Sequence, residues 1–271
     1  MMTSRIASVA IAGSLALLAS CLAPALEAQT VARRVAGAPD GKVRFTFAAR
    51  PDICGHGTFI TRRNESNSRM TWSSTDNEDV EYAEFCDENP VRIVLDVRGG
   101  SISKIRTYVG GRWRPARSTV TDLGNVSTRE ATDFLLGLAS SDRDRVGREA
   151  VFPMTLADSV VVWPGLLRLA RDAGKPPETR KQAVFWLGQA AGESITANLA
   201  TLANEDDVDT QIREQAVFAL SQRRNAEGVP ALIQIARSNR NPSVRKKAMF
   251  WLGQTNDPRA VALFEEILTR R

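Results

Sequence analysis

Apolar residues recur with two different periods along this chain of 271 residues. In the first half they alternate with polar residues, most regularly over 91–98, and Gly99 and Gly100 then lead into a second alternating run over 101–109. A period of two is typical of strands with one buried and one solvent-exposed face, and adjacent glycines are typical of a turn. The sequence therefore predicts a β-hairpin inside a small β-rich domain over 41–113.

Other segments of the same domain have the pattern of shorter strands. Val43, Phe45 and Phe47 alternate with polar residues, and three further apolar runs are separated by polar loops. Together with the hairpin they predict one sheet of about five strands, which is near the usual size. The three further runs lie at 58–61, 69–73 and 81–86.

After Ser127 the apolar period becomes helical and the sequence repeats itself. A motif that reads Arg-x-x-Ala-Val/Met-Phe-x-Leu in its clearest copies recurs with its alanine at positions 150, 183, 216 and 248. Leucine-rich segments lie between the copies at the same spacing of 32 to 33 residues. Paired helices at this period cannot bury their apolar stripes alone and must stack. We predict an α-solenoid of about four and a half repeats over 127–271, joined to the β domain by a linker over 114–126.

Capping signals mark where the predicted helices begin. Ser127 and Glu130 have the spacing of a capping box, in which the two residues satisfy each other's backbone donors. Asn241 and Asp257 each precede a proline at the first helical position, which is a common start of a helix. Pro153, by contrast, falls inside the helix of the first motif copy and should kink it.

The repeats resemble the HEAT-repeat family, most closely its short, bacterial, phycobilisome-lyase-like subtype. The resemblance is carried by a Val/Ile/Thr-Arg-x-x-Ala-x-x-x-Leu pattern that starts at Thr179, Ile212 and Val244. It implies a solenoid whose second helices line the concave side, but it does not specify an activity. It also implies that three arginines pair with acidic residues in the turns between repeats: Arg180, Arg213 and Arg245.

Helical geometry places a phenylalanine on the polar side of each repeated helix. At about 100° per residue, Phe185 lies about 200° from Ala183, the centre of the buried arc, with a glutamine beside it. The same register recurs in the next two copies of the motif. We predict a partner-binding stripe that consists of Phe185, Gln189, Phe218, Gln222, Phe250 and Gln254.

Two explanations fit a row of phenylalanines on a polar face. In the first, the β domain or the linker packs into the concave side and makes the row part of the core. In the second, the row is an open groove for a partner peptide, because aligned exposed aromatic side chains mark interaction sites. We expect both along the array, with Phe152 and Phe185 covered and Phe250 exposed.

The first 28 residues have the organisation of a secretory signal peptide. Arg5 precedes an uncharged apolar run over 6–19 that is too short to span a membrane, and small residues precede a cleavage point near Ala28. The segment that ends in Cys21 also resembles a bacterial lipobox. The sequence predicts a secreted or periplasmic protein that is attached to a membrane only if Cys21 is lipidated.

Export constrains the chemistry of the cysteines. Once Cys21 is removed or acylated, Cys54 and Cys86 are expected to pair in an oxidising compartment. A thiol nucleophile or a metal site that includes His56 is disfavoured, because both thiols would have to stay reduced and a fourth ligand is missing. We predict a Cys54–Cys86 disulfide, no metal and no cofactor.

Composition narrows the functional classes further. The chain is 43% hydrophobic and 25% charged, which is typical of a globular protein and excludes a largely disordered one. With one histidine and no spaced carboxylate pair, nothing meets the geometric requirements of catalysis. A net charge of +5 does not indicate nucleic-acid binding. We interpret the basic residues over 223–247 as solvated surface.

These observations predict an α+β multidomain protein, with a small disulfide-pinned β-rich domain followed by an all-α HEAT-like solenoid. We expect a secreted or periplasmic, non-enzymatic interaction scaffold whose partner is a protein or peptide and not a nucleic acid. Two alternatives stay open. One is a lipid-anchored envelope scaffold, and the other is an accessory enzyme with a site between the β domain and the repeats.

Overall fold

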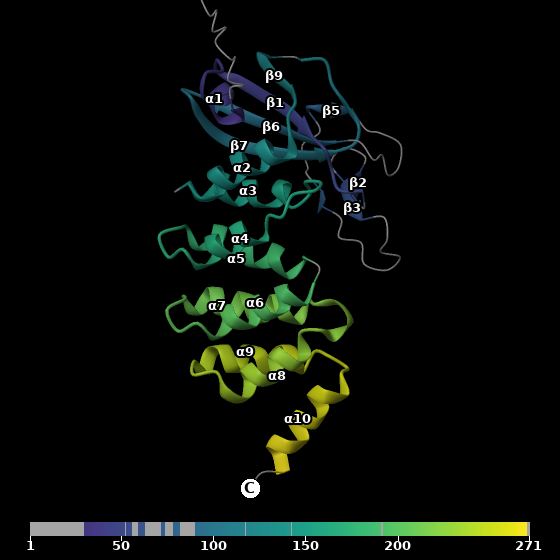
Figure 1. Cartoon of the computed structure of the whole chain (residues 1–271), viewed down its shortest axis with the longest axis vertical. Coiled ribbons are helices and arrows are strands. Elements are labelled where there is room, and N and C mark those ends of the chain that lie inside the picture. The colour runs from purple at the N-terminus through teal and green to yellow at the C-terminus, as the bar shows by residue number, and fades with distance from the viewer. Residues whose placement is uncertain are drawn as a thin grey trace, which may run out of the picture.

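The computed structural model describes two connected regions of the chain. The N-terminal region is rich in strands and the C-terminal region is a row of helices (Figure 1). The predicted signal peptide over 1–28 and Cys86 lie outside the described residues. The structure describes residues 30–51, 53–55, 59–62, 72–73, 78–81, 90–116, 118–141, 143–190 and 192–269.

Four strands form the main sheet, in the order β7-β6-β1-β9. Strand β1 is antiparallel to β6 and parallel to β9. Gly99 and Gly100 close the turn between β6 and β7 with φ angles of 56° and 67°, which glycine adopts without strain. The predicted hairpin is therefore confirmed. The four strands are β1 (Gly41–Phe47), β6 (Val91–Arg98), β7 (Ser101–Val109) and β9 (Val120–Asn125).

The remaining strands form two smaller sheets, so the expectation of one five-stranded sheet is wrong. Strands β2, β3 and β4 make one of them, and β5 pairs with β8 in the other. Val80 of β5 packs with Val94 and Tyr108 on the outer face of the main sheet, so this segment covers apolar groups there. The strands are β2 (Ile53–Gly55), β3 (Phe59–Arg62), β4 (Trp72–Ser73), β5 (Val80–Glu81) and β8 (Arg112–Trp113).

Two elements of this region have no counterpart in the sequence-based prediction. Residues 114–126, interpreted as a linker, include β9, whose Asp, Gly and Asn residues have low strand propensity. A short helix, α1 (Val31–Ala36), precedes β1 and buries Val31 and Val35. Both elements are held by their contacts with the rest of the fold more than by their own sequence.

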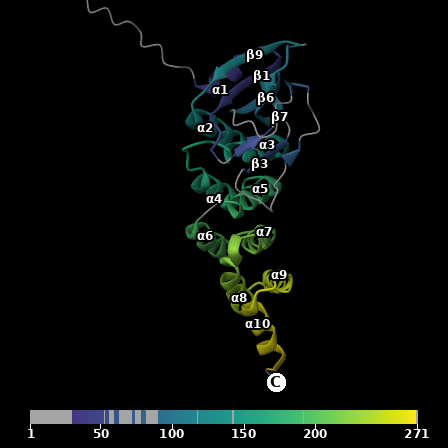
Figure 2. The same cartoon turned by 90° about the vertical axis from the view of Figure 1, so that its right-hand side faces the viewer.

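In the described part of the chain, nine helices follow β9. They stack so that α3, α5, α7 and α9 lie along one side, with α4, α6 and α8 along the other (Figure 2). Helix α5 packs on α7, and α7 packs on α9. The predicted helical solenoid is confirmed. Its helices are α2 (Thr128–Ala139), α3 (Asp144–Met154), α4 (Trp163–Arg171), α5 (Pro177–Gly188), α6 (Glu193–Asn204), α7 (Thr210–Ser221), α8 (Val229–Ser238), α9 (Pro242–Leu252) and α10 (Pro258–Thr269).

The predicted capping residues act at the starts of their helices. The Glu130 N–H donates to Ser127 Oγ at 3.2 Å, and Ser127 Oγ donates to Glu130 Oε2 at 3.0 Å. Asn241 Oδ1 accepts from the N–H of Ser243 at 2.9 Å. Pro153 lies in the last turn of α3, which ends at the next residue. The proline therefore coincides with the end of the helix, and the kink expected there stays a prediction.

The main sheet covers the first end of the helical stack. Phe45 of β1 meets Phe134 of α2 edge-on, with 6.1 Å between ring centroids, and β7 packs on α3. The N–H of Ile105 donates to Glu149 Oε2 at 2.7 Å. Apolar side chains of both regions form one continuous core. The sheet thus acts as the cap that the terminal repeat of a solenoid requires.

The opposite end of the stack is covered less completely. Helix α10 contacts α8 and buries Ala260 and Leu263. It then runs away from the stack at the C-terminal end (Figure 1). Leu268, in its last turn, is 82% exposed.

Candidate binding face of the helical array

Four phenylalanines occupy equivalent positions on the side of the stack formed by α3, α5, α7 and α9. The first three are half-buried, whereas Phe250 is 54% exposed. The repeated alanines two residues earlier are fully buried, as the helical period requires. We call the following set the aromatic stripe: Phe152, Phe185, Phe218 and Phe250, with Gln189, Gln222 and Gln254.

Tryptophans in α5 and α9 connect the rings of neighbouring repeats. Phe152 of α3 stacks on Trp186 of α5, with centroids 4.7 Å apart. Phe218 of α7 meets Trp251 of α9 at a centroid distance of 5.0 Å. Each tryptophan also meets the phenylalanine beside it in its own helix edge-on. The rings therefore form two groups, each of which spans two repeats.

An alanine replaces the tryptophan in α7 for a steric reason. A Cβ added at Gly188 of α5 would lie 2.8 Å from the Cβ of Ala219. The two helices approach too closely at this point for an indole ring. This close approach separates an N-terminal ring group around Trp186 from a C-terminal ring group around Trp251.

The C-terminal ring group has the features of a binding surface. Phe250 is exposed, and so are the amides of Gln222 and Gln254. The indole Nε1 of Trp251 is buried without an acceptor among the described residues. Aromatic rings can pack against the apolar side chains of a peptide, and amides can both donate to and accept from its backbone.

The described residues of the β domain do not run along this part of the stripe. In both views the main sheet, β2 and β3 lie above the height of α5, while α7 and α9 lie below it (Figures 1 and 2). Strand β9, in the predicted linker, belongs to the main sheet. The N-terminal ring group therefore lies close to the β domain, and the described residues of that domain leave α7 and α9 uncovered.

The repeated arginines connect successive repeats from the inside. Arg180 Nε donates to the carbonyl of Ala170, at the end of α4, at 3.0 Å, and its Nη1 pairs with Asp209 at the start of α7. Arg213 repeats the arrangement, with 3.2 Å from its Nε to the carbonyl oxygen of Ala203. Both arginines are buried, so their contacts hold the stack together and are not available to a partner.

Arg245 lies in the last complete pair of helices and has different contacts. Its Nη1 donates to the carbonyl oxygens of Asn239 at 2.6 Å and Arg240 at 3.1 Å, both in the turn before its own helix. The side chain is half-buried. It stabilises that turn without reaching into a following repeat.

Arg223 is buried and makes several hydrogen bonds, so the interpretation of 223–247 as solvated surface is wrong for this residue. Its guanidinium donates to Thr196 Oγ1 at 3.0 Å, to the Gly192 carbonyl at 3.0 Å and to Glu227 Oε2 at 2.9 Å. It also donates to the carbonyl of Gly188, at the end of α5, and to that of Ala190, in the turn that follows. Thr255 takes the equivalent place one repeat later. Comparison of the repeats therefore carried no signal for this residue.

Other members of the basic segment pair with acidic residues across repeats. Arg237 pairs with Glu266 of α10, and Arg240 Nη1 lies 3.0 Å from Asp206 Oδ2. These exposed pairs contribute little to stability. Two lysines of α9 have no ion-pair partner among the described residues: Lys246 and Lys247.

The outer face of the main sheet carries a separate polar cluster. Arg106 is 6% exposed and donates to Asp79 Oδ2 at 2.8 Å and to both carboxylate oxygens of Asp96 at 2.6 and 2.8 Å. The Tyr108 hydroxyl donates to Asp79 at 3.2 Å. Burial alone would raise the pKa of Asp96, but the hydrogen bond and charge of Arg106 lower that pKa below its ordinary value. The opposite charges of these side chains compensate each other within the cluster.

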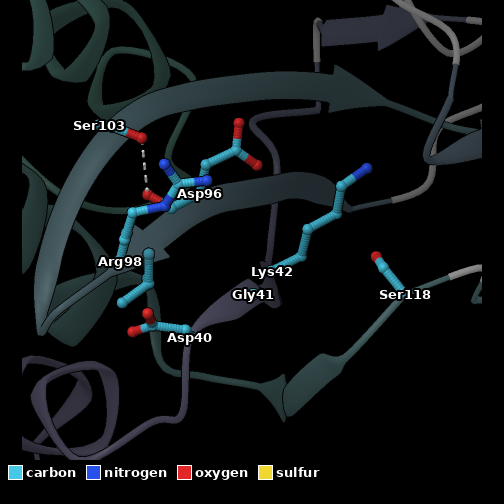
Figure 3. Close-up of a pocket in the computed structure, with 8 residues that line it drawn as sticks. Asp40, Gly41, Lys42, Asp96, Arg98, Ser103 and Ser118 are labelled. Carbon is cyan, nitrogen blue, oxygen red and sulfur yellow. Dashed lines mark hydrogen bonds between the residues drawn. The ribbon is translucent and has the colours of Figure 1, made fainter.

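An open hollow of about 630 Å³ borders this cluster (Figure 3). Ser103 Oγ donates to the carbonyl of Asp96 at 3.3 Å. Carboxylates and cations lie side by side around the hollow, so its charge favours neither an anion nor a cation. Its lining includes Asp40, Lys42, Asp96, Arg98, Ser103 and Ser118.

The cysteine and metal predictions have a limited counterpart in the structure. Cys54 is buried in β2, and its expected partner Cys86 lies outside the described residues, so their pairing stays a prediction. Among the residues that the structure describes, no three side chains of His, Cys, Asp or Glu gather as metal ligands. In the same part of the chain, no helix is long and apolar enough to cross a membrane.

Comparison with known proteins identifies the C-terminal part of the array. Residues 205–271, which include α7 to α10, match the HEAT repeats family. No curated protein matches the chain. The match confirms, for this segment, the resemblance drawn from the repeated motif. The β-rich region has no recognised family.

Proposed function

We propose that this protein is a non-enzymatic interaction scaffold that binds a protein or peptide on the aromatic stripe. One observation carries the proposal: Phe250 and the amides of Gln222 and Gln254 are exposed on the side where the preceding rings are half-buried. HEAT repeats at 205–271 support it, because stacked repeats create extended binding surfaces. The proposed partner needs no cofactor and is not a nucleic acid.

The stripe offers a partner the same set of groups on successive helices. A peptide that crosses the stack would meet a ring on α7 and an amide just after that helix, and the same pair at α9. Rings of this kind become energetic hot spots when a partner excludes water from them. We therefore place the centre of the interface at the C-terminal ring group.

We also propose that the protein works outside the cytoplasm, either secreted or in a periplasm. The support is the signal-peptide pattern of residues 1–28. Attachment to a membrane is proposed only for the case in which Cys21 carries a lipid. Mass spectrometry of the mature N-terminus distinguishes cleavage near Ala28 from acylation of Cys21.

Affinity capture with matched variants tests the binding face. Purified protein is immobilised, incubated with an extract of secreted and envelope proteins, and the bound proteins are quantified by mass spectrometry. The test variant is Phe218→Ala. The control is Val161→Ala, which removes an apolar side chain that is 74% exposed between α3 and α4. A ligand of the stripe binds the wild type and the control equally and binds the test variant about 30-fold more weakly.

Two results would count against the proposal. In the first, every captured protein is retained by Phe218→Ala and by Gln254→Ala. In the second, the ligand is lost equally with the Val161→Ala control. Circular dichroism of each variant shows whether the helices remain folded, so a loss of binding can be assigned to the stripe.

A further inference from the structure

One position of the repeated helix changes its charge from repeat to repeat, while the ring and the amide stay the same. It lies four residues before each phenylalanine and is occupied by Lys181 in α5, Glu214 in α7 and Lys246 in α9. We call these three residues the charged row. We propose that it selects the partner of the aromatic stripe, which is an extended segment with a basic residue over α7 and an acidic residue over α9. The inference rests on the proposed function and adds the chemistry of the partner.

The charges of the row differ in whether the chain itself compensates them. Lys181 Nζ lies 2.8 Å from Glu178 Oε1 in the same helix. Among the described residues, Glu214 and Lys246 have no ion-pair partner, and neither does Lys247, the next residue of α9. Glu214 is half-buried and Lys246 is exposed. The α5 position is therefore compensated within its own helix, whereas α7 and α9 present uncompensated charges of opposite sign.

Helical geometry places the charged row along one border of the aromatic stripe. Glu214 and Phe218 are four residues apart in α7, so they are neighbours on the helix surface, separated by about 40° around its axis. Lys246 has the same place relative to Phe250 in α9. Helix α7 packs on α9. The two uncompensated charges therefore lie beside adjacent rings on adjacent helices.

The distance between neighbouring helices determines the spacing of the partner's charges. Packed helices lie about 8–10 Å apart. A segment in the polyproline II conformation, which is common in unfolded chains, rises about 3.1 Å per residue and places every third residue on the same side. Two of its residues three positions apart are therefore about 9 Å apart and can face α7 and α9 in turn. Apolar residues next to them in the segment then point toward the rings.

A segment without these charges is disfavoured at this border of the stripe. Binding removes water from Glu214, which is already half-buried, and from the lysines of α9. A desolvated charge that gains no opposite charge costs free energy, and a like charge across the interface adds repulsion. The rings and amides, which the repeats share, can hold many segments. Selectivity therefore comes from the charged row.

Selection of peptides on the purified full chain tests the charge pattern. The probe is a phage-displayed library of random peptides of about 12 residues, long enough to cross three helices at about 3.1 Å per residue. We expect enriched peptides to carry Lys or Arg three positions from Asp or Glu, beside apolar residues. On Glu214→Lys, an acidic residue should replace the basic one. The control is Glu193→Lys, which makes the same change at an exposed position of α6, on the other side of the stack, and should keep the wild-type pattern.

A reciprocal exchange of charges tests whether the contact is direct. The dissociation constant of one enriched peptide, measured by fluorescence anisotropy, should rise about tenfold with Lys246→Glu. Changing the acidic residue of the peptide to lysine should weaken binding to the wild type by a similar factor. The changed peptide should recover most of that loss on Lys246→Glu. Recovery of this kind requires that the two charges face each other, and a variant that had lost its fold could not show it.

The possible results separate this inference from the scaffold proposal. Peptides that need Phe218 but show no charge pattern, or that do not respond to the two reversals, would overturn the selection by charge and leave the stripe as a binding face. The same holds if Glu193→Lys changes the pattern as much as Glu214→Lys does. Peptides that bind Phe218→Ala as well as the wild type, or a library from which nothing is enriched, would overturn both proposals.

Discussion

The two ends of the helical array cover the apolar surface of their last helices in different ways. At the N-terminal end a four-stranded sheet, built from segments far apart in sequence, covers α2 and α3 and joins their core. At the C-terminal end α10 covers the last pair of helices with two buried side chains, Ala260 and Leu263. In the described residues, the array is thus anchored at one end and less covered at the other, which we call the open end, and four of the five large exposed hydrophobic side chains lie there.

Removing a ring at the covered end should have the largest effect on stability. Phe45→Ala empties a fully buried position between the sheet and α2, and we expect a loss of about 3–5 kcal/mol in the free energy of unfolding. Urea unfolding monitored by circular dichroism measures it. A loss below about 1 kcal/mol would mean that the sheet and the helices do not share a core.

The loss of stability caused by a cavity in the middle of the array should spread toward both ends. Leu220 of α7 is buried, and Leu220→Ala should cost about 2–5 kcal/mol. Because each repeat is stabilised by its neighbours, hydrogen exchange should increase in α5 and α9 as well as in α7. If exchange increases in α7 alone, the repeats are less coupled than the stack implies.

The disulfide predicted for the β domain should strengthen the covered end only. Closing a loop of about 33 residues between Cys54 and Cys86 should contribute roughly 3–4 kcal/mol. The double variant C54S/C86S should lose that stability, with the first change in exchange in the strands and not in α9. Thiol titration of denatured, unreduced protein provides the direct check, and two free thiols outside the signal segment would contradict the prediction.

A smaller, pH-dependent effect should distinguish the covered end. The pKa of Asp96 is lowered below its ordinary value of 3.8 mainly by Arg106, against the effect of burial. Its contribution to stability is therefore present above about pH 4 and disappears as the pH falls through the lowered pKa. Asp96→Asn should cost about 1 kcal/mol at pH 7 and less at pH 2. An equal loss at both pH values would exclude the Arg106 contact as its cause.

The smallest effect is expected at the open end. Phe250→Ala should change the free energy of unfolding by less than about 0.5 kcal/mol, as at other surface positions. Phe218→Ala, which removes a ring that contacts Trp251, should cost about 1 kcal/mol more. Equal and large losses at both positions would show that something covers α9 and would remove the aromatic stripe as a binding face.

The sequence predicted what short-range patterns determine. The alternation over Val91–Arg98 and Ser101–Val109, the two glycines between them and the 33-residue repeat all correspond to elements of the structure. These features depend on residues close together in the chain, where period, turn chemistry and capping act directly. The phenylalanine positions followed from the same helical geometry.

Long-range contacts set the limit of that prediction. Strand β9 pairs with β1 although its sequence has little strand propensity, so a distant partner decides its conformation. The stacking of Phe152 on Trp186 needs knowledge of how one helix lies on the next. The bonds of Arg223 reach back to residues 31 to 35 positions earlier, and no local pattern encodes them.

Arg223 also affects how the array deforms under load. Solenoids bend through small rotations at each junction between repeats. The guanidinium of Arg223 connects the loop after α5 to the loop after α7 along one edge of a junction. That edge therefore resists stretching, and any rotation at the junction must pivot about it. We expect the array to bend least at this junction. A force applied to the C-terminal end should therefore deform the packing of α8 to α10 first.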